Sequence, residues 1–152
     1  MTDVLAPVAG LVRPLSEVPD PVFAAEMVGA GVAIEPDGGI TDAVSPVAGT
    51  LLKMHPHAFV VLTPEGTGVL VHLGIDTVRL EGVGFELLVT EKSQVEAGQP
   101  VTRWDPTDVV ARGLSPMVML CVLDTKPGAV ASEHLGESVA VGASLFDWPA
   151  TS

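Results

Sequence analysis

The residues best suited to chemistry near neutral pH are the four histidines, His55, His57, His72 and His134. Histidine is the side chain whose ordinary pKa lets it gain or lose a proton between pH 5 and 8. Sequence motifs typical of other chemistries are missing, since the chain has no G-x-x-x-x-G-K-[ST] loop, no G-x-S-x-G elbow and no H-E-x-x-H helix. The one cysteine, Cys121, lies in an apolar run that favours a buried, inert thiol. The histidines are therefore the main candidates for function.

Two of the histidines belong to a predicted β-hairpin. The segments 57–62 and 69–73 are apolar, and they enclose the sequence Thr63-Pro64-Glu65-Gly66-Thr67-Gly68. Proline followed by glycine at this spacing suits a tight turn that ends in a left-handed residue. The pattern predicts two antiparallel strands joined by this turn.

The pairing register of the hairpin decides which side chains share a face. We take Leu62 and Val69 as the first pair after the turn. His57 and His72 then lie on one face as diagonal neighbours, with Cα atoms roughly 7–8 Å apart. The same face is expected to hold two apolar side chains, Phe59 and Leu70. A partly apolar face around two histidines suits docking of a protein partner.

Several kinds of site remain open for this pair. A single histidine, such as His134, is most often a surface or structural residue, but two on one face favour phosphoryl transfer, proton transfer or metal binding. His55-Pro56-His57 is an H-x-H pattern, so a zinc-binding enzyme or module that uses His57 and His72, with His55 as a further ligand, is the alternative. A lipoyl-like carrier, suggested by segment 95–101, is weaker because the predicted hairpin turn has no lysine.

Charge and composition exclude several classes of partner. Seven Lys and Arg against 19 Asp and Glu give a net charge of −12, which repels nucleic acid and anionic lipid. The longest strongly apolar stretch, 113–123, is far shorter than the ~20 residues of a membrane helix. A single cysteine and an N-terminus without a signal-peptide pattern predict a cytoplasmic protein. We expect one domain over residues 1–152, and the high charge favours a monomer.

The elements expected to position the histidines are mostly strands. The chain is rich in valine, has 16 Gly and 13 Pro and lacks Tyr, which favours an all-β fold with many turns. One short helix is predicted at 106–113, where Pro and Asp begin it and Gly ends it, and a second is a weaker prediction at 21–27. The predicted strands are Leu11–Arg13, Val32–Glu35, Thr50–Met54, Ala58–Leu62, Val69–Leu73, Phe85–Val89, Met117–Leu123, Ser138–Val141 and Ser144–Phe146.

An internal repeat suggests how these strands are organised. The sequence Ala6-Pro7-Val8-Ala9-Gly10-Leu11-Val12 returns 39 residues later as Ser45-Pro46-Val47-Ala48-Gly49-Thr50-Leu51. Two copies of one β motif can pack face to face and share a core. The other explanation is coincidence, because Pro-Val-Ala-Gly is a common string in a chain of this composition.

Longer motifs resemble a known family, the glucose-type enzyme IIA of the bacterial phosphoenolpyruvate-dependent sugar phosphotransferase system. The most specific is Val71-His72-Leu73-Gly74-Ile75-Asp76-Thr77-Val78 followed by Gly82-Val83-Gly84-Phe85, and it comes at the right distance after His57-Ala58-Phe59. The resemblance covers roughly residues 5–145. It implies an antiparallel β-sandwich or barrel with a duplicated motif, a barrel-sandwich hybrid, and one or two short helices.

The resemblance also implies a function and roles for residues. His72 would accept a phosphoryl group from a histidine-containing phosphocarrier protein, and the group would pass to a cysteine on the IIB domain of a membrane sugar permease. His57 would hydrogen-bond the bound phosphoryl group, and a backbone carbonyl near Gly74 would hold the second nitrogen of His72. No cofactor is implied. The docking residues would be Asp20, Val22, Phe23, Met27, Val28, Phe59, Leu70 and Asp76.

Two of these assignments have competing explanations. Asp20 and Asp76 would meet basic groups on the carrier protein, but both also stand in sequences that suit turns. The chain departs from the family pattern at His55, which stands where many members have a small polar residue, often threonine. His55 would either take over a hydrogen bond there or point to solvent.

Overall fold

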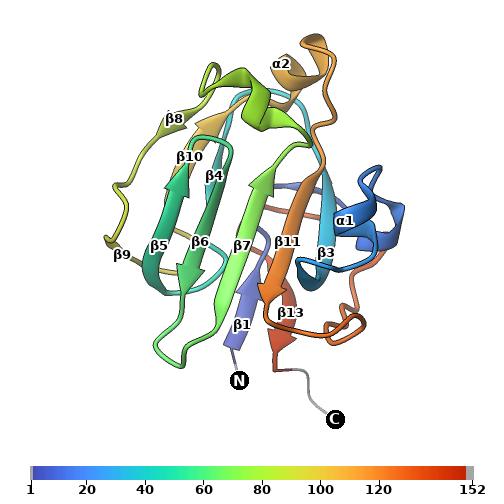
Figure 1. Cartoon of the computed structure of the whole chain (residues 1–152), viewed down its shortest axis with the longest axis vertical. Coiled ribbons are helices and arrows are strands. Elements are labelled where there is room, and N and C mark those ends of the chain that lie inside the picture. The colour runs from blue at the N-terminus through green and yellow to red at the C-terminus, as the bar shows by residue number, and fades with distance from the viewer. Residues whose placement is uncertain (1, 150–152) are drawn as a thin grey trace.

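The computed structural model describes residues 2–149, and antiparallel strands make up most of it (Figure 1). The strands are β1 (Thr2–Leu5), β2 (Gly10–Pro14), β3 (Gly29–Pro36), β4 (Thr41–Val44), β5 (Gly49–His55), β6 (Ala58–Leu62), β7 (Gly68–Leu73), β8 (Glu86–Leu87), β9 (Gln94–Val95), β10 (Pro100–Trp104), β11 (Val118–Leu123), β12 (Ser138–Val139) and β13 (Ser144–Trp148). The helical pieces are two α-helices, α1 (Pro21–Ala24) and α2 (Pro106–Ala111), and two 3-10 turns, η1 (Leu15–Glu17) and η2 (Thr77–Leu80).

The strands form one large sheet and two small ones. The large sheet has eight strands in the order β12-β2-β3-β11-β7-β6-β5-β9, and it curls around the core. Strands β4, β10 and β8 form the second sheet, and β1 pairs with β13 in the third. All strand pairs within the described residues are antiparallel. The predicted all-β, antiparallel fold is therefore confirmed.

Strand β11 is buried on both faces, and this explains its unbroken apolar sequence. Leu120 lies in the main core enclosed by the curled sheet, whereas Met119 and Cys121 belong to a second cluster on the other face. That second cluster is covered by Leu15 of η1 and Phe23 of α1. The helix α1 is thus fixed against the outer face of the large sheet, next to β7.

The internal repeat is structural, because its two copies form the same hydrogen bonds with each other. Leu5 N–H donates to the carbonyl of Pro46, and Val44 N–H donates to the carbonyl of Pro7, each at 2.9 Å. The repeated glycines serve close approach of neighbouring strands, since a Cβ on Gly49 would lie 2.2 Å from the carbonyl oxygen of Leu62. A Cβ on Gly10 would meet the next strand in the same way. The duplicated motif is confirmed, and coincidence is excluded.

The predicted elements match the structure best where strands are long and apolar. Both predicted helices are present, and each predicted strand overlaps an observed one, although 85–89 shortens to β8 and 138–141 to β12. The prediction missed β1, β4, β9 and β10, which are short or contain Asp, Thr and Pro. Within residues 2–149, each helix is too short or too polar to cross a lipid bilayer.

Candidate functional site

The hairpin of β6 and β7 has a register one residue away from the predicted one. Ala58 pairs with His72, and Leu62 pairs with Gly68 at the end of the ladder, whereas the predicted partner of Leu62 was Val69. Thr63 causes the shift, because its N–H donates to the carbonyl of Thr67 at 2.9 Å, and its Oγ1 accepts from the N–H of the same residue at 3.0 Å. The turn is therefore closed by this threonine pair.

The shifted register moves Phe59 to the other face of the sheet. Phe59 pairs with Val71 and is 0% exposed in the main core. The prediction that Phe59 shares a face with the histidines and belongs to the docking surface is wrong, because a fully buried ring cannot contact a partner. Leu70 keeps its predicted place, half-buried and packed on the outer cluster below α1.

His57 and His72 nevertheless meet. Their ring centroids are 5.1 Å apart with an interplanar angle of 72°. His72 reaches this position from β7, whereas His57 lies in the two-residue turn between β5 and β6, outside the regular strand. In a regular strand with this register, His57 and His72 would lie on opposite faces of the sheet. Side chains in a turn do not alternate between the two faces, so the ring of His57 can approach that of His72. The predicted proximity is confirmed, although for a different reason.

One nitrogen of His72 is fixed by the backbone. Nδ1 lies 2.7 Å from the carbonyl oxygen of Gly74. A carbonyl oxygen can only accept a hydrogen bond, so Nδ1 carries the proton and Nε2 presents its lone pair when the ring is neutral. The predicted carbonyl near Gly74 is thus found.

The direction of the Gly74 carbonyl depends on a tightly packed turn. Gly74 has φ = +84°, which favours glycine, and a Cβ there would lie 2.5 Å from Cγ2 of Thr77. Its N–H donates to the carbonyl of Met117 at 2.9 Å. Buried Thr77 donates from Oγ1 to the carbonyl of Leu73 at 2.7 Å and so fastens the turn from the other side. Sequence reasoning did not single out Thr77, although it stands in the specific motif around His72.

Burial keeps both imidazoles neutral near pH 7. Desolvation is the main cause that lowers the pKa of His72, and it outweighs the Gly74 hydrogen bond and the charges of Asp20 and Asp76, which raise it. The pKa of His57 is also lowered, first by burial and then by the nearby His72 and His55. His72 therefore offers an unprotonated Nε2 near pH 7 without the help of a base.

Helix α1 forms one wall of the site. The ring of Phe23 lies 5.3 Å from that of His72, at an angle of 60°. Asp20 caps this helix, since its Oδ1 accepts hydrogen bonds from the N–H groups of Val22 at 2.9 Å and Phe23 at 3.3 Å. The structural explanation of Asp20 as a turn and cap residue thus holds, and its charge acts on His72 as well.

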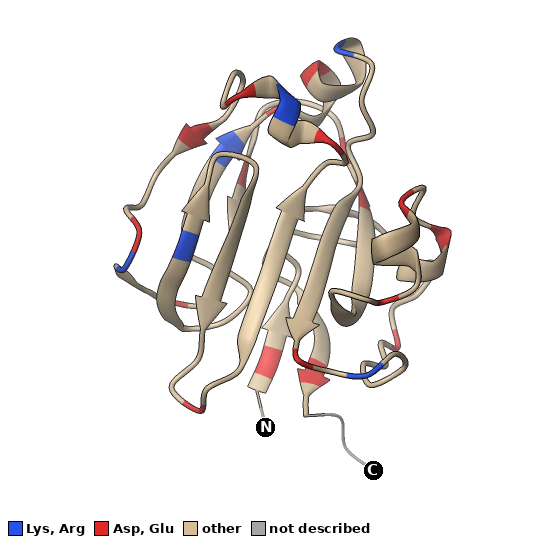
Figure 2. Cartoon of the chain, in the orientation of Figure 1, with Lys and Arg blue, Asp and Glu red and all other residues tan. Residues whose placement is uncertain are grey.

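The surface around the two histidines is apolar at its centre and acidic at its edge. Met27 is 74% exposed and Val22 is 47% exposed, while Val28 is half-buried. Strands β6, β7 and β11 contain no charged residue, so the middle of the sheet is uncharged along its length (Figure 2). The charges of Asp20 and of the exposed Asp76 both act on His72, so both carboxylates lie near it. Such a surface can exclude water around a reacting group and attract a basic partner.

Metal chemistry finds no support at this site. Within the described residues no three His, Cys, Asp or Glu side chains gather closely enough to hold a metal ion. Among the described residues, His55 therefore does not complete a three-ligand set with His57 and His72. Cys121 is buried, and desolvation raises the pKa of its thiol to about 12, as expected for an inert core residue.

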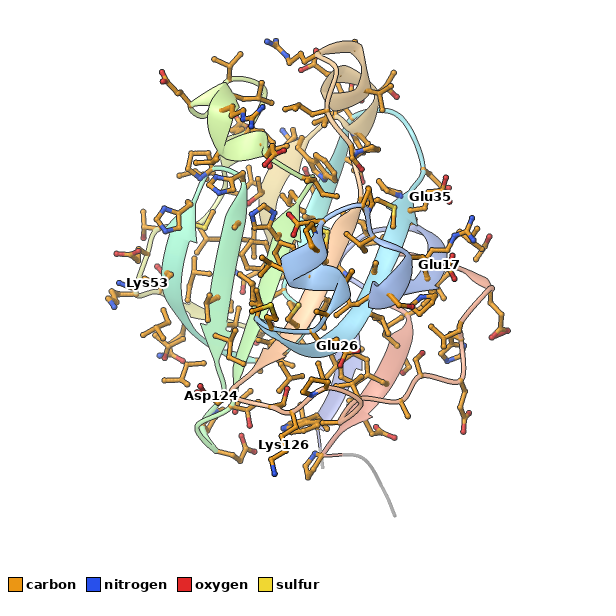
Figure 3. All side chains as sticks on the ribbon, turned by 45° about the vertical axis from the view of Figure 1, so that its right-hand side comes forward. Glu17, Glu26, Glu35, Lys53, Asp124 and Lys126 are labelled. Carbon is orange, nitrogen blue, oxygen red and sulfur yellow. The ribbon has the colours of Figure 1, made fainter. Side chains whose placement is uncertain are left out.

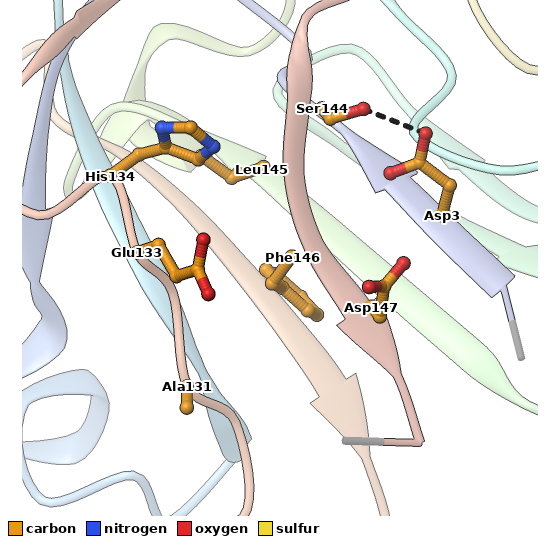
Figure 4. Close-up of a pocket in the computed structure, with 8 residues that line it drawn as sticks. All are labelled: Asp3, Ala131, Glu133, His134, Ser144, Leu145, Phe146 and Asp147. Carbon is orange, nitrogen blue, oxygen red and sulfur yellow. Dashed lines mark hydrogen bonds between the residues drawn. The ribbon is translucent and has the colours of Figure 1, made fainter. Parts of the chain in front are cut away.

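A separate hollow of about 510 Å³ lies beside β13 (Figure 4). It is lined by acidic side chains, among them Asp3 and Glu133, and by His134. The contacts there are structural, since Ser144 donates to Asp3 at 2.7 Å and His134 Nδ1 lies 3.2 Å from Glu137. This hollow lacks the paired imidazoles of the site on β7.

Comparison with known proteins decides the family. Residues 2–127 match the family model described as "phosphoenolpyruvate-dependent sugar phosphotransferase system, EIIA 1". The chain belongs to this family. The EIIA chain is therefore a phosphotransferase component, which carries a phosphoryl group within the sugar phosphotransferase system.

Its relatives include both separate and fused proteins. The glucose-specific EIIA component of Bacillus cereus is 36% identical over 143 residues, which cover 93% of this EIIA chain and 83% of that protein. The glucose permease IIA from Mycoplasma capricolum has a TM-score of 0.78 at 35% identity, with 95% and 93% of the two chains covered. The N-acetylglucosamine-specific EIICBA component of Escherichia coli is 47% identical over 107 residues, or 69% of this chain, but the match spans only 16% of its length. The glucose-specific EIIBCA component of Corynebacterium glutamicum is likewise matched over 21% of its length.

Proposed function

We propose that Nε2 of His72 is the atom that carries the phosphoryl group. The observation that carries this proposal is the 2.7 Å contact between Nδ1 of His72 and the carbonyl of Gly74, which leaves Nε2 as the free nucleophile. The His72 side chain is half-buried, and the apolar ring of Phe23 lies 5.3 Å from its own ring. Positioning of the reacting groups is a main contribution of the protein to phosphoryl transfer, and here it means holding the ring in the correct tautomer and orientation.

The donor is a phosphohistidine of a histidine-containing phosphocarrier protein. In the transfer, the lone pair on Nε2 of His72 forms a new N–P bond while the N–P bond on the carrier breaks and its electron pair returns to the carrier's imidazole. No oxidant, metal or cofactor is needed for this balance. His57, with its ring 5.1 Å from that of His72, donates a hydrogen bond to a phosphoryl oxygen.

The acceptor is a cysteine on the IIB domain of a membrane sugar permease, and both partners use the same surface in turn. That surface is defined by Asp20, Val22, Phe23, Met27, Val28, Leu70 and Asp76, without Phe59. Its apolar centre and acidic edge support docking of a partner that presents an apolar face with a basic rim. The net charge of −12 supports transient encounters of a monomer with such partners.

The setting and the sugar follow from the relatives by analogy. The fused relatives are named as glucose-specific and N-acetylglucosamine-specific components, so we assign this chain to uptake of a sugar of that class. Because the phosphoryl group starts on phosphoenolpyruvate, a metabolite, the chain would work in the cytoplasm. The residues of the described site do not contact a sugar in this scheme.

Intact-mass spectrometry tests the proposal. The chain is incubated with phosphoenolpyruvate, enzyme I and the histidine carrier, and we expect a gain of one acid-labile phosphoryl group. His72→Ala should abolish the gain, His57→Gln should retain it while slowing onward transfer, and His134→Ala should behave like the wild type. Phosphorylation of the His72→Ala variant would contradict the assignment.

A further inference from the structure

His55 extends the histidine pair into a row of three imidazoles. It ends β5 and pairs with Ala58, so that only the two-residue turn separates it from β6. Its ring centroid lies 6.0 Å from that of His57, and the planes are inclined by 32°, while His57 in turn lies 5.1 Å from His72. His55 is exposed, whereas the other two rings are partly buried. The order of the row therefore runs from solvent into the site.

The three rings carry charge of the same sign when protonated, so protonation of one opposes protonation of its neighbour. His57 feels this from both sides, since His55 and His72 each lower its pKa in addition to burial. The acidic groups nearby, Asp20 and Asp76, act on His72. His55 is thus the group that acts on His57 without touching the atom that is phosphorylated.

Lys53 is the other cation on this strand. It is exposed and stands two residues before His55, and its side chain points away from α1, toward the outer edge of the sheet (Figure 3). Of these two exposed side chains on β5, His55 is the one whose ring lies beside that of His57.

We propose that His55 is a positioning residue of this site: its ring lies beside His57 on the solvent side, and its positive charge opposes a second positive charge on His57, which favours the neutral form of the histidine pair. The link to phosphoryl transfer rests on the proposed function, but the coupling between the two rings does not. The consequence is a site that keeps His57 neutral to lower pH than the pair alone would. Phosphorylation of His72 would then add negative charge that counteracts His55 and favours a protonated, donating His57.

NMR titration of the unphosphorylated chain tests the coupling. The Cε1–H signals of histidine are followed from pH 5 to 8.5 at low salt in the wild type, in His55→Gln and in His55→Lys. Removal of the charge in His55→Gln should move the midpoint of His57 up by several tenths of a pH unit, the size expected for charges about 6 Å apart in a solvent-like medium. The permanent charge in His55→Lys should move it down.

The paired variants separate charge from shape. If the His57 midpoint moves in the same direction in both, or in neither, the proposal is overturned. His134→Gln is the matched control, since His134 lies outside the row and its loss should leave His57 unchanged. The shifts should shrink in about 0.5 M salt because exposed charges are screened. Mass spectrometry on the same samples tests phosphorylation separately, so a failure of the proposed function does not imitate a failure of the coupling.

Discussion

Phe59 offers the sharpest test of the corrected hairpin register. In the observed register its ring is 0% exposed and packs in the main core, opposite Val71. Replacement of a fully buried Phe by Ala usually costs about 3–5 kcal/mol, from lost apolar burial and from the cavity that remains. Because a domain of this size is typically stable by about 5–15 kcal/mol, Phe59→Ala should remove a large share of the free energy of unfolding.

Urea unfolding followed by tryptophan fluorescence measures this loss, and buried Trp104 is a suitable reporter. With about 2–4 °C per kcal/mol for a domain of this length, the melting temperature should fall by about 10 °C. Phe59→Leu keeps most of the volume, so it should cost only about 1–1.5 kcal/mol and leave the rate of phosphoryl uptake unchanged.

Met27→Ala is the matched surface variant, because Met27 is 74% exposed next to the histidines. It should change stability by less than about 0.5 kcal/mol and slow phosphoryl uptake from the carrier several-fold. The reasoning fails if the pattern is reversed. A Phe59→Leu variant of wild-type stability with strongly slowed uptake would mean that Phe59 does contact the partner and that the predicted register was right.

Three further outcomes follow from the site and the repeat. Gly74→Ala should slow phosphoryl uptake at least about tenfold, because the new Cβ would clash with Thr77 and turn the Gly74 carbonyl away from His72. Single-turnover assays measure this rate. An unchanged rate would show that the carbonyl does not hold the His72 ring. The pKa of His72 in the folded chain lies below its ordinary value of 6.5, so the unfolded chain binds more protons in this range. The contribution of His72 to stability is therefore complete above about pH 6.5 and is lost as the pH falls through the folded pKa. The urea midpoint should drop less between pH 7.5 and 5.5 in His72→Gln than in the wild type. Gly49→Ala should lower the free energy of unfolding by at least about 2 kcal/mol, since its Cβ would lie 2.2 Å from a backbone oxygen. Gly68→Ala is the matched control and should cost much less, because its Cβ would lie 3.2 Å from the end of the flexible Leu123 side chain. Urea unfolding measures both.

The long apolar strands and the repeat could be predicted because local pattern and burial agree there. Ala58–Leu62 coincides with β6, and the second Pro-Val-Ala-Gly sequence forms the same contacts as the first. Short strands such as β4 could not be found, since its Thr-Asp-Ala-Val sequence becomes a strand only by pairing with β10, far along the chain.

The histidine site shows a different limit. The motif around His72 pointed to the correct residues, but the face of Phe59 depended on a one-residue choice of register, and that choice was decided by the side chain of Thr63. Strand parity also could not position His57, because a turn residue follows the geometry of its turn. A backbone carbonyl near Gly74 that binds Nδ1 of His72 could be predicted from the family motif. The hydrogen bond of Thr77 that stabilises the turn could not.

The pairing of β1 with β13 has a mechanical consequence. Thr2 lies opposite Trp148, so the first and last described strands begin and end side by side, near the turn of the β6–β7 hairpin and away from His72 at the other end of β7 (Figure 1). A force that pulls on these two ends would load the hydrogen bonds of the β1–β13 ribbon one after another and open it like a zip, instead of shearing all of them together. Because Val4 and Phe146 belong to the main core, the unzipping would uncover that core before it reached the histidines.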